Sequence, residues 1–142
     1  MTVDTRLLIV DDEPAILFAL WDYLARCGYT VDRARSRQEA ERLLAQASYQ
    51  LIVADLRLGT AEPRGGLEVL RHARRHQPWA RMILLTAYGS AEVEAEVAGI
   101  EAVRLLSKPQ PLARIAEEIV ALLSVGPDSG RSVRNPEAPE LP

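Results

Sequence analysis

The chain has 142 residues, of which 48% are hydrophobic, and carries a formal net charge of -3. This length supports one hydrophobic core, and the charge lacks the basic surplus with which proteins bind nucleic acid or anionic membranes. Cys27 is the only cysteine, which excludes an internal disulfide, and no apolar run is long enough to span a membrane. We therefore expect a cytoplasmic protein without nucleic-acid or membrane contacts, in which Cys27 fills space in the core.

Short apolar runs alternate with amphipathic segments along the chain. The apolar runs are candidate strands, at residues 6–10, 29–34, 51–55, 81–86 and 102–107. Helical spacing of apolar residues predicts helices between and after them, at residues 14–27, 36–47, 67–77, 90–98 and 111–123. Five such repeats predict an α/β fold, with a single doubly wound, five-stranded parallel sheet covered by helices on both faces.

The composition changes after residue 124 to glycine, proline, serine and charged residues. Such a segment has little apolar surface to bury. We expect one folded domain over residues 1–124, followed by a disordered tail or linker over residues 125–142.

Polar side chains follow the candidate strands at the point where each strand ends. They are Asp11, Asp12, Asp55, Thr86 and Lys108. The carboxyl ends of parallel strands form the ligand-binding edge of an open sheet, so these five side chains are expected to converge in one crevice. Lys108 is also the only lysine among 17 basic residues, and its compact ammonium differs from the planar fork of arginine.

Three neighbouring carboxylates repel one another, and their pKa values rise unless a cation lies among them. Mg²⁺ prefers oxygen ligands, commonly one or two carboxylates together with water and phosphate oxygens. The ammonium and hydroxyl groups at the same edge suit a phosphoryl group. Asp55 is left as the candidate nucleophile of a phosphoryl transfer.

The motifs Val10-Asp11-Asp12-Glu13, Asp55, Thr86-Ala87 and Lys108-Pro109 occur in the order typical of the receiver domain of two-component response regulators. The chain resembles this family from about residue 6 to residue 123. The resemblance implies a flavodoxin-like receiver fold with strand order 2-1-3-4-5. It also implies that Asp55 accepts a phosphoryl group from a histidine kinase or a histidine phosphotransfer protein.

The resemblance further implies a metal site. Asp12 would ligate Mg²⁺ together with Asp55 and the main-chain carbonyl of Arg57. Asp11 would hold a metal-bound water and Lys108.

On the phosphoryl side, the resemblance implies that Lys108 pairs with phospho-Asp55 and that Thr86 moves in to hydrogen-bond it. The small Ala87 would leave room for the phosphodonor. The protein would be a stand-alone switch in a phosphorelay and not an enzyme, apart from hydrolysis of its own aspartyl phosphate. Its output would be contacts with a protein target, which the sequence does not name, or formation of a homodimer.

Two features depart from the family pattern. Leu105 stands where the family commonly has an aromatic residue whose rotamer reports phosphorylation, so coupling would have to run through Thr86 and loop movement. The loop at residues 58–66 is a few residues longer than usual and lies beside the expected site. Arg57 and Tyr88 flank the expected path of an attacking water.

Other interpretations stay open. A phosphatase that forms an aspartyl phosphate would use Asp11 as its nucleophile, but such enzymes carry Asp-x-Asp after the first strand. A flavin protein would need a loop rich in Ser, Thr and Gly at that place. A receiver that binds partners without phosphorylation, and a receiver segment of a hybrid kinase or larger regulator, are the closer alternatives. His72 and His76 are expected on a solvated basic face and not in a metal site, and Trp21 and Trp79 are expected to be packing residues.

Overall fold

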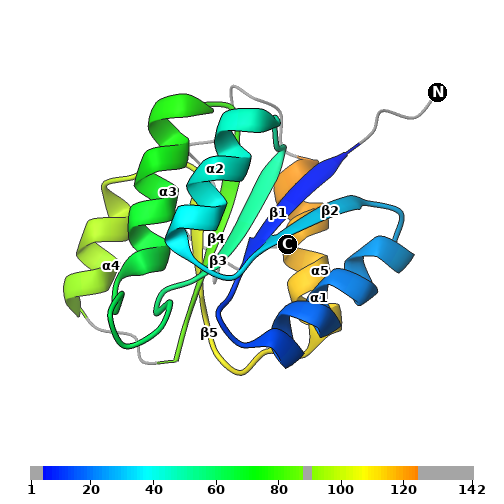
Figure 1. Ribbon diagram of the computed structural model, residues 1–142, viewed down its shortest axis with the longest axis horizontal. Helices are drawn as coiled ribbons and strands as arrows, with labels where there is room; N and C mark the ends of the chain where they lie inside the picture. Colours follow the sequence, from blue (N-terminus) through cyan, green and yellow to red (C-terminus); the bar gives the residue numbers. More distant parts are fainter. Residues whose placement is uncertain (1–4, 88–90, 125–142) are drawn as a thin grey trace, which may run out of the picture.

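The computed structural model describes residues 5–87 and 91–124, in which strands and helices alternate (Figure 1). The strands are β1 (Arg6–Val10), β2 (Thr30–Ala34), β3 (Leu51–Asp55), β4 (Arg81–Thr86) and β5 (Val103–Ser107). The helices are α1 (Pro14–Arg26), α2 (Arg37–Gln46), α3 (Gly65–His76), α4 (Ala91–Ala98) and α5 (Leu112–Leu123). The strands pair in parallel in the order β2-β1-β3-β4-β5, which confirms the predicted fold and strand order.

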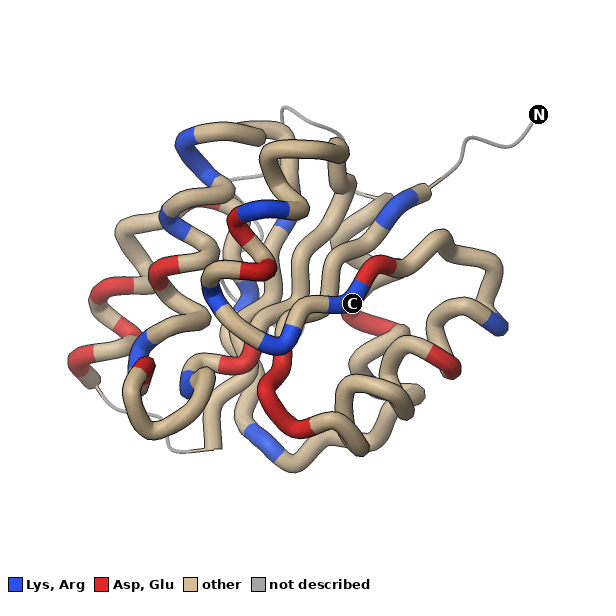
Figure 2. Tube along the Cα trace, viewed as in Figure 1, with Lys and Arg blue, Asp and Glu red and all other residues tan. Residues whose placement is uncertain are grey.

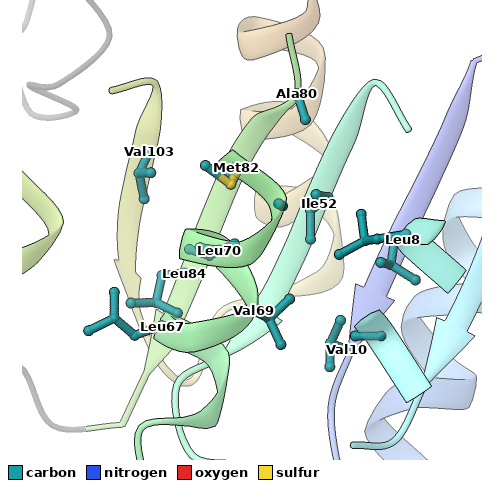
Figure 3. Close-up of a cluster of buried hydrophobic side chains, with 14 of the residues drawn as sticks. Leu8, Val10, Ile52, Leu67, Val69, Leu70, Ala80, Met82, Leu84 and Val103 are labelled. Carbon is teal, nitrogen blue, oxygen red and sulfur yellow. The ribbon is translucent and has the colours of Figure 1, made fainter. Parts of the chain in front are cut away.

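The sheet separates two hydrophobic clusters. Because successive side chains of a strand point to opposite faces, each inner strand supplies both clusters. On the α2 and α3 side, Ile52, Met82 and Leu84 pack against Leu67 and other residues of α3 (Figure 3). The other face packs against α1 and α5. Every residue of β3 is buried, as its continuous apolar run predicts for a central parallel strand.

The start of α2 confirms the capping pattern of the sequence. The Glu39 main-chain N–H donates to Ser36 Oγ at 3.1 Å. The Glu39 side chain in turn accepts a hydrogen bond from the Arg35 N–H at 2.6 Å, one residue before the cap. Both bonds use main-chain donors that the helix itself cannot satisfy, so they fix where α2 begins.

The prediction that Cys27 fills the core is wrong, because its side chain is exposed. Helix α1 ends at Arg26, and Cys27 occupies the C-cap, beyond the last inward turn at Leu24. Gly28 then adopts a φ of 103°, a left-handed conformation that favours glycine and turns the chain away from the helix.

The two tryptophans differ in their packing. Trp21 packs against the cluster beneath α1 and lies under the Arg33 guanidinium, which is 4.3 Å from its ring centroid. Trp79 is 50% exposed, although its Nε1–H donates to the Tyr49 carbonyl at 3.1 Å. The expected packing role is therefore confirmed for Trp21 and only partly for Trp79.

The described residues contain no helix long and apolar enough to cross a membrane. Tyr88, expected beside the path of an attacking water, and the tail or linker expected at residues 125–142 lie outside the described residues.

Candidate functional site

The polar side chains predicted to converge do meet at the carboxyl edge of the sheet. Figure 2 shows the acidic stretch that follows β1 at this edge. An open pocket of about 540 Å³ lies there, at the ends of β3 and β4. The predicted site residues that line it are Asp12, Asp55, Arg57, Thr86, Ala87 and Lys108. Asp11 joins them through its contacts with the neighbouring carboxylates and with Lys108.

Asp11, Asp12 and Asp55 form one carboxylate cluster. Each offers an oxygen, and these three oxygens all lie within 4.8 Å of one another. Asp11 Oδ1 accepts a hydrogen bond from the Glu13 main-chain N–H at 2.9 Å. Asp11 Oδ2 is buried and has no hydrogen-bond partner among the described residues. A buried carboxylate oxygen of this kind, beside two further carboxylates, suits a hard divalent cation such as Mg²⁺.

The electrostatics of the cluster favour a positive charge. Burial, and after it the neighbouring Asp11 carboxylate, raise the pKa of Asp55 from 3.8 to about 6, against the lowering effect of Lys108. Burial likewise raises the pKa of Asp11. The protein thus keeps carboxylates together at a place where water solvates them poorly, and a cation would relieve this cost.

Lys108 reaches the cluster from the end of β5. Its Nζ lies 3.3 Å from Asp55 Oδ1 and 4.0 Å from Asp11 Oδ2. The Lys108 main-chain N–H also donates to the Thr86 carbonyl at 2.8 Å, which ties together the chain segments that follow β4 and β5. Thr86, the last residue of β4, is 3% exposed. Leu105 of β5 packs against the hydrophobic cluster on the α3 side of the sheet.

Gly66 allows α3 to begin directly against the end of β3. Its N–H donates to the Leu56 carbonyl at 2.8 Å. A Cβ atom at this position would overlap the main-chain carbonyl of Asp55. The sequence predicts a loop as far as Gly66, whereas α3 begins at Gly65. Only the Gly65-Gly66 pair indicates a close approach of two backbone segments.

The pocket also includes residues that the sequence did not predict. Gly59, Thr60 and Pro63, from the long loop after β3, form part of its wall, as do Glu13 and Leu56. The length of the loop was evident from the sequence. Its contribution to the wall depends on how the loop folds back, which local patterns do not show.

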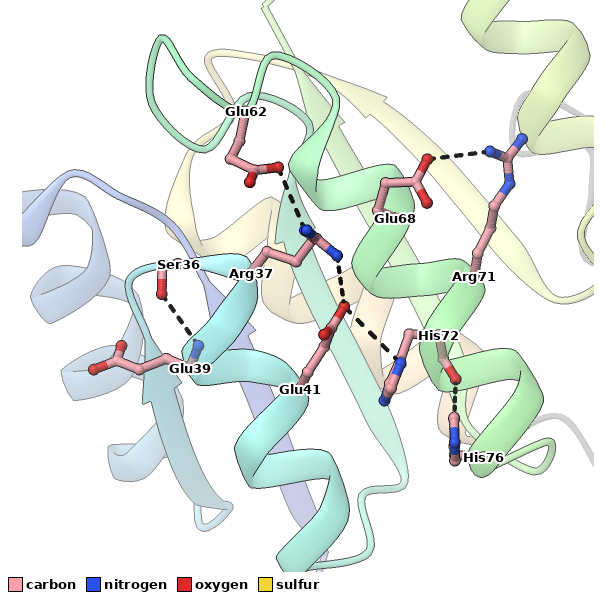
Figure 4. A network of polar contacts seen from close by, with 9 residues as sticks. All are labelled: Ser36, Arg37, Glu39, Glu41, Glu62, Glu68, Arg71, His72 and His76. Carbon is pink, nitrogen blue, oxygen red and sulfur yellow. Dashed lines mark hydrogen bonds and ion pairs between the residues drawn. The ribbon is translucent and has the colours of Figure 1, made fainter.

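His72 and His76 lie on α3 (Figure 4) and are not among the residues that line this pocket. Their rings stack with centroids 4.1 Å apart, and His72 Nδ1 lies 3.9 Å from a carboxylate oxygen of Glu41 on α2. The His72 side chain is only 22% exposed, less than the solvated face predicted from the sequence, and burial lowers its pKa. Among the described residues, the aspartates are the one group with the spacing of a metal site.

Sequence comparisons agree with the geometry. A family profile for the response regulator receiver domain matches residues 7–120. The response regulator protein PilR of Pseudomonas aeruginosa is 34% identical over 138 residues, which cover 96% of this chain and 28% of that protein. The alginate biosynthesis transcriptional regulatory protein AlgB of the same species is 38% identical over 104 residues, or 73% of this chain and 22% of that protein. The chain thus spans about a quarter of the length of these relatives.

Solved structures show the same fold. A response regulator from Burkholderia pseudomallei with a phosphorylated aspartic acid, a calcium ion and citrate has a TM-score of 0.74 at 29% identity, covering 96% of this chain and 76% of that one. A CheY-like receiver domain protein from Methanospirillum hungatei JF-1 has a TM-score of 0.78 at 28% identity, covering 86% of this chain and 95% of that one.

Proposed function

Because the chain belongs to the response regulator receiver domain family, we propose that it is a phosphorylatable switch whose acceptor is Asp55. The phosphorus would pass from the imidazole nitrogen of a phosphohistidine to a carboxylate oxygen of Asp55. The O–P bond forms as the N–P bond breaks and its electron pair stays on the imidazole nitrogen. Because the other ring nitrogen of the phosphohistidine carries a proton, the donor is released as neutral imidazole. The donor would be a histidine kinase or a histidine phosphotransfer protein of the cytoplasm.

The observation that carries this proposal is the contact of Lys108 with Asp55. The single lysine of the chain places its Nζ 3.3 Å from Asp55 Oδ1, within a cluster of three carboxylates. This ammonium can neutralise charge on a phosphoryl group at Asp55, and the Thr86 hydroxyl in the same pocket can donate a hydrogen bond to it. The proposal also has support from the Burkholderia pseudomallei response regulator, whose structure contains a phosphorylated aspartic acid.

A metal completes the proposed site. Asp12, Asp55 and the main-chain carbonyl of Arg57 would hold Mg²⁺. Asp11 would hold a water molecule bound to the ion. The ion would supply positive charge that offsets the negative charge of the carboxylates and the phosphoryl group. The residues themselves position the acceptor oxygen and limit its solvation.

The output would be a change in protein contacts. Phosphorylation adds negative charge and strong hydrogen-bond acceptors at Asp55, and a rearrangement near Thr86 could pass this change to α4, β5 and α5. Leu105 offers no aromatic ring for the signal, so the segment after β4 has to carry it. The resulting surface would bind a target protein or a second copy of the chain. The proposal holds for a chain that acts alone and equally for one that is the receiver segment of a longer regulator, like its relatives.

Intact mass spectrometry after incubation with acetyl phosphate and Mg²⁺ tests the proposed chemistry. We expect the wild type to gain one phosphoryl group, and expect no gain in Asp55→Asn or in a sample with excess EDTA. Uptake by Asp55→Asn at the wild-type level would exclude Asp55 as the acceptor. A folded wild type that takes up nothing would favour a receiver that binds its partners without phosphorylation.

A further inference from the structure

The loop between β3 and α3 forms a wall of the Asp55 pocket. Its residues Gly59, Thr60 and Pro63 line the pocket. Leu58, which is 5% exposed, anchors the loop in the core, and its N–H donates to the Glu62 carbonyl at 2.9 Å. The Glu62 N–H donates in turn to the Gly59 carbonyl at 3.1 Å. The loop is therefore a compact turn, and a displacement of Glu62 would also move the residues that form the pocket wall.

An ion pair connects this turn to α2. The Glu62 carboxylate lies 3.4 Å from Nε of Arg37. Nη1 of the same guanidinium lies 3.1 Å from the carboxylate of Glu41, one helical turn further along α2 (Figure 4). This contact orients the guanidinium. Glu41 thus positions Arg37, and Arg37 holds the turn from the outside.

A second ion pair connects the end of the loop to α4. Arg64, the N-cap residue of α3, pairs with the Glu96 carboxylate of α4. The other oxygen of this carboxylate lies 3.8 Å from the Arg71 guanidinium of α3. The loop is consequently attached to a different helix at each side of the turn.

Both attachments are weak enough to open without unfolding the domain. The side chains of Arg37 and Glu62 are 39% and 40% exposed, and those of Arg64 and Glu96 are 38% and 35% exposed. Ion pairs of this exposure typically change an equilibrium by about two- to fivefold, and salt screens them. Such contacts suit the control of loop opening and contribute little to folding.

We propose that Arg37 and Glu96 are positioning residues that hold this loop against the Asp55 pocket and limit the access of water to the aspartyl phosphate. The inference rests on the proposed function. In the step concerned, a water oxygen bonds to phosphorus and the P–O bond to Asp55 breaks. The Asp55 carboxylate and inorganic phosphate are released, and the proton of the water passes to solvent. A loop freed from either helix admits water more often, so the phosphorylated state becomes shorter-lived.

The lifetime of the phosphorylated protein tests this role in Arg37→Gln and Glu96→Gln. Matched controls are Arg42→Gln on α2 and Glu94→Gln on α4, whose exposed side chains form no ion pair within the described part of the chain. Each variant is loaded with acetyl phosphate and Mg²⁺, freed of the donor, and followed by intact mass. We expect half-lives about two- to fivefold shorter in the two test variants and unchanged in the controls. In about 1 M NaCl the difference from wild type should disappear, because the Debye length falls to about 3 Å.

A double-mutant cycle separates this role from a general loss of stability. Since Arg37 acts through Glu62, the variant with both Arg37→Gln and Glu62→Gln should lose phosphate no faster than either single variant. Hydrogen exchange of the main-chain amides of Leu58 and Glu62 should accelerate in Arg37→Gln and not in Arg42→Gln, whether or not the protein is phosphorylated.

Two further outcomes are distinguishable. Equal lifetimes in all variants, with normal loading of the wild type, would overturn the positioning role and leave the proposed function standing. A wild type that takes up no phosphoryl group would overturn both.

Discussion

Buried polar groups at the two ends of the sheet differ in how fully their hydrogen bonds are satisfied within the chain. Near the amino ends of β1 and β3, the Tyr49 hydroxyl donates to Asp32 at 2.7 Å, and Arg6 reaches the same carboxylate at 3.2 Å. Gln77, 4% exposed, donates to the carbonyls of Leu44 and Ala47. At the carboxyl edge, three carboxylates lie together, only two of them contact the Lys108 ammonium, and a buried oxygen of the cluster has no described hydrogen-bond partner.

This difference separates a structural polar network from a chemical one. Buried polar groups in native proteins normally find hydrogen-bond partners, and perturbed pKa values concentrate at functional sites. Gln77 uses its capacity within the chain, accepting from the Tyr49 N–H at 2.8 Å as well as donating twice. The aspartates of the cluster have oxygens that can still bind a cation or another group from outside the chain. We therefore expect mutations at the two ends to act on stability with opposite signs.

Asp55→Asn should give the largest effect. It should abolish phosphoryl uptake and also stabilise the metal-free protein at pH 7 to 8. The pKa of Asp55 is raised from 3.8 to about 6 on folding, so the native state binds more protons than the unfolded state between about pH 4 and 6. Stability therefore falls as the pH rises through this interval, and the whole loss is present at pH 7 to 8. Above pH 6, ionised Asp55 lowers the free energy of unfolding by about 3 kcal/mol, and the neutral amide of Asn would remove this loss. Thermal unfolding at pH 4 and pH 8 in EDTA measures it.

The pH dependence provides the control for this prediction. Asn and Asp should give similar stabilities near pH 4, where Asp55 is largely protonated in the folded protein. Saturating Mg²⁺ should stabilise the wild type more than the variant. A wild type already more stable than Asp55→Asn at pH 8 in EDTA would contradict the view that the cluster is costly.

Gln77→Ala should produce the opposite result at the other end of the sheet. It leaves the Tyr49 N–H and the Leu44 carbonyl without their buried partner, and each such loss costs about 1 to 3 kcal/mol. We expect urea denaturation to show a loss of stability of about 2 kcal/mol or more at constant m-value. Phosphoryl uptake under native conditions should stay normal, and a specific loss of uptake in the folded variant would contradict the separation of the two ends.

Tyr49→Phe is a milder test of the amino end. It removes one hydroxyl from Asp32, which retains Arg6 as a partner, so we expect a loss of about 0.5 to 1.5 kcal/mol. Urea denaturation at pH 7 measures the change. An effect as large as that of Gln77→Ala would indicate that the Asp32 carboxylate depends on the hydroxyl more than the ion pair suggests.

The sequence predicts the carboxyl edge better than its surroundings. Asp11 and Lys108 each directly follow a strand, Asp55 is the last residue of one, and parallel strands bring such ends together. The sheet order came from the family resemblance and is confirmed. Local periodicity was enough because each residue is fixed by the strand that carries it.

Features that depend on distant contacts could not be predicted in this way. Thr60 and Pro63 line the pocket only because Leu58 is buried and bonds back to Glu62. Cys27 continues the helical spacing of α1, but the helix ends one residue before it, so the spacing no longer describes where its side chain lies. In both cases, the side chain lies beyond the end of a helix or strand. Its position depends on the direction that the chain takes there, and the periodicity of apolar residues does not predict that direction.

Lys108→Arg should have the smallest effect on stability and a selective effect on chemistry. The guanidinium keeps the positive charge near Asp55 and Asp11, so the midpoint of thermal unfolding should stay close to that of wild type. The Lys108 side chain is 22% exposed, and its ammonium stands between two carboxylates. The planar fork cannot place its charge at that point without moving one of them. We therefore expect uptake from acetyl phosphate to slow by about tenfold, equivalent to about 1.4 kcal/mol in the transition state. Lys108→Gln, which loses the charge altogether, should be slower still. If both variants load at the wild-type rate, the ammonium has no part in the transfer, and the contact with Asp55 serves only to compensate its charge.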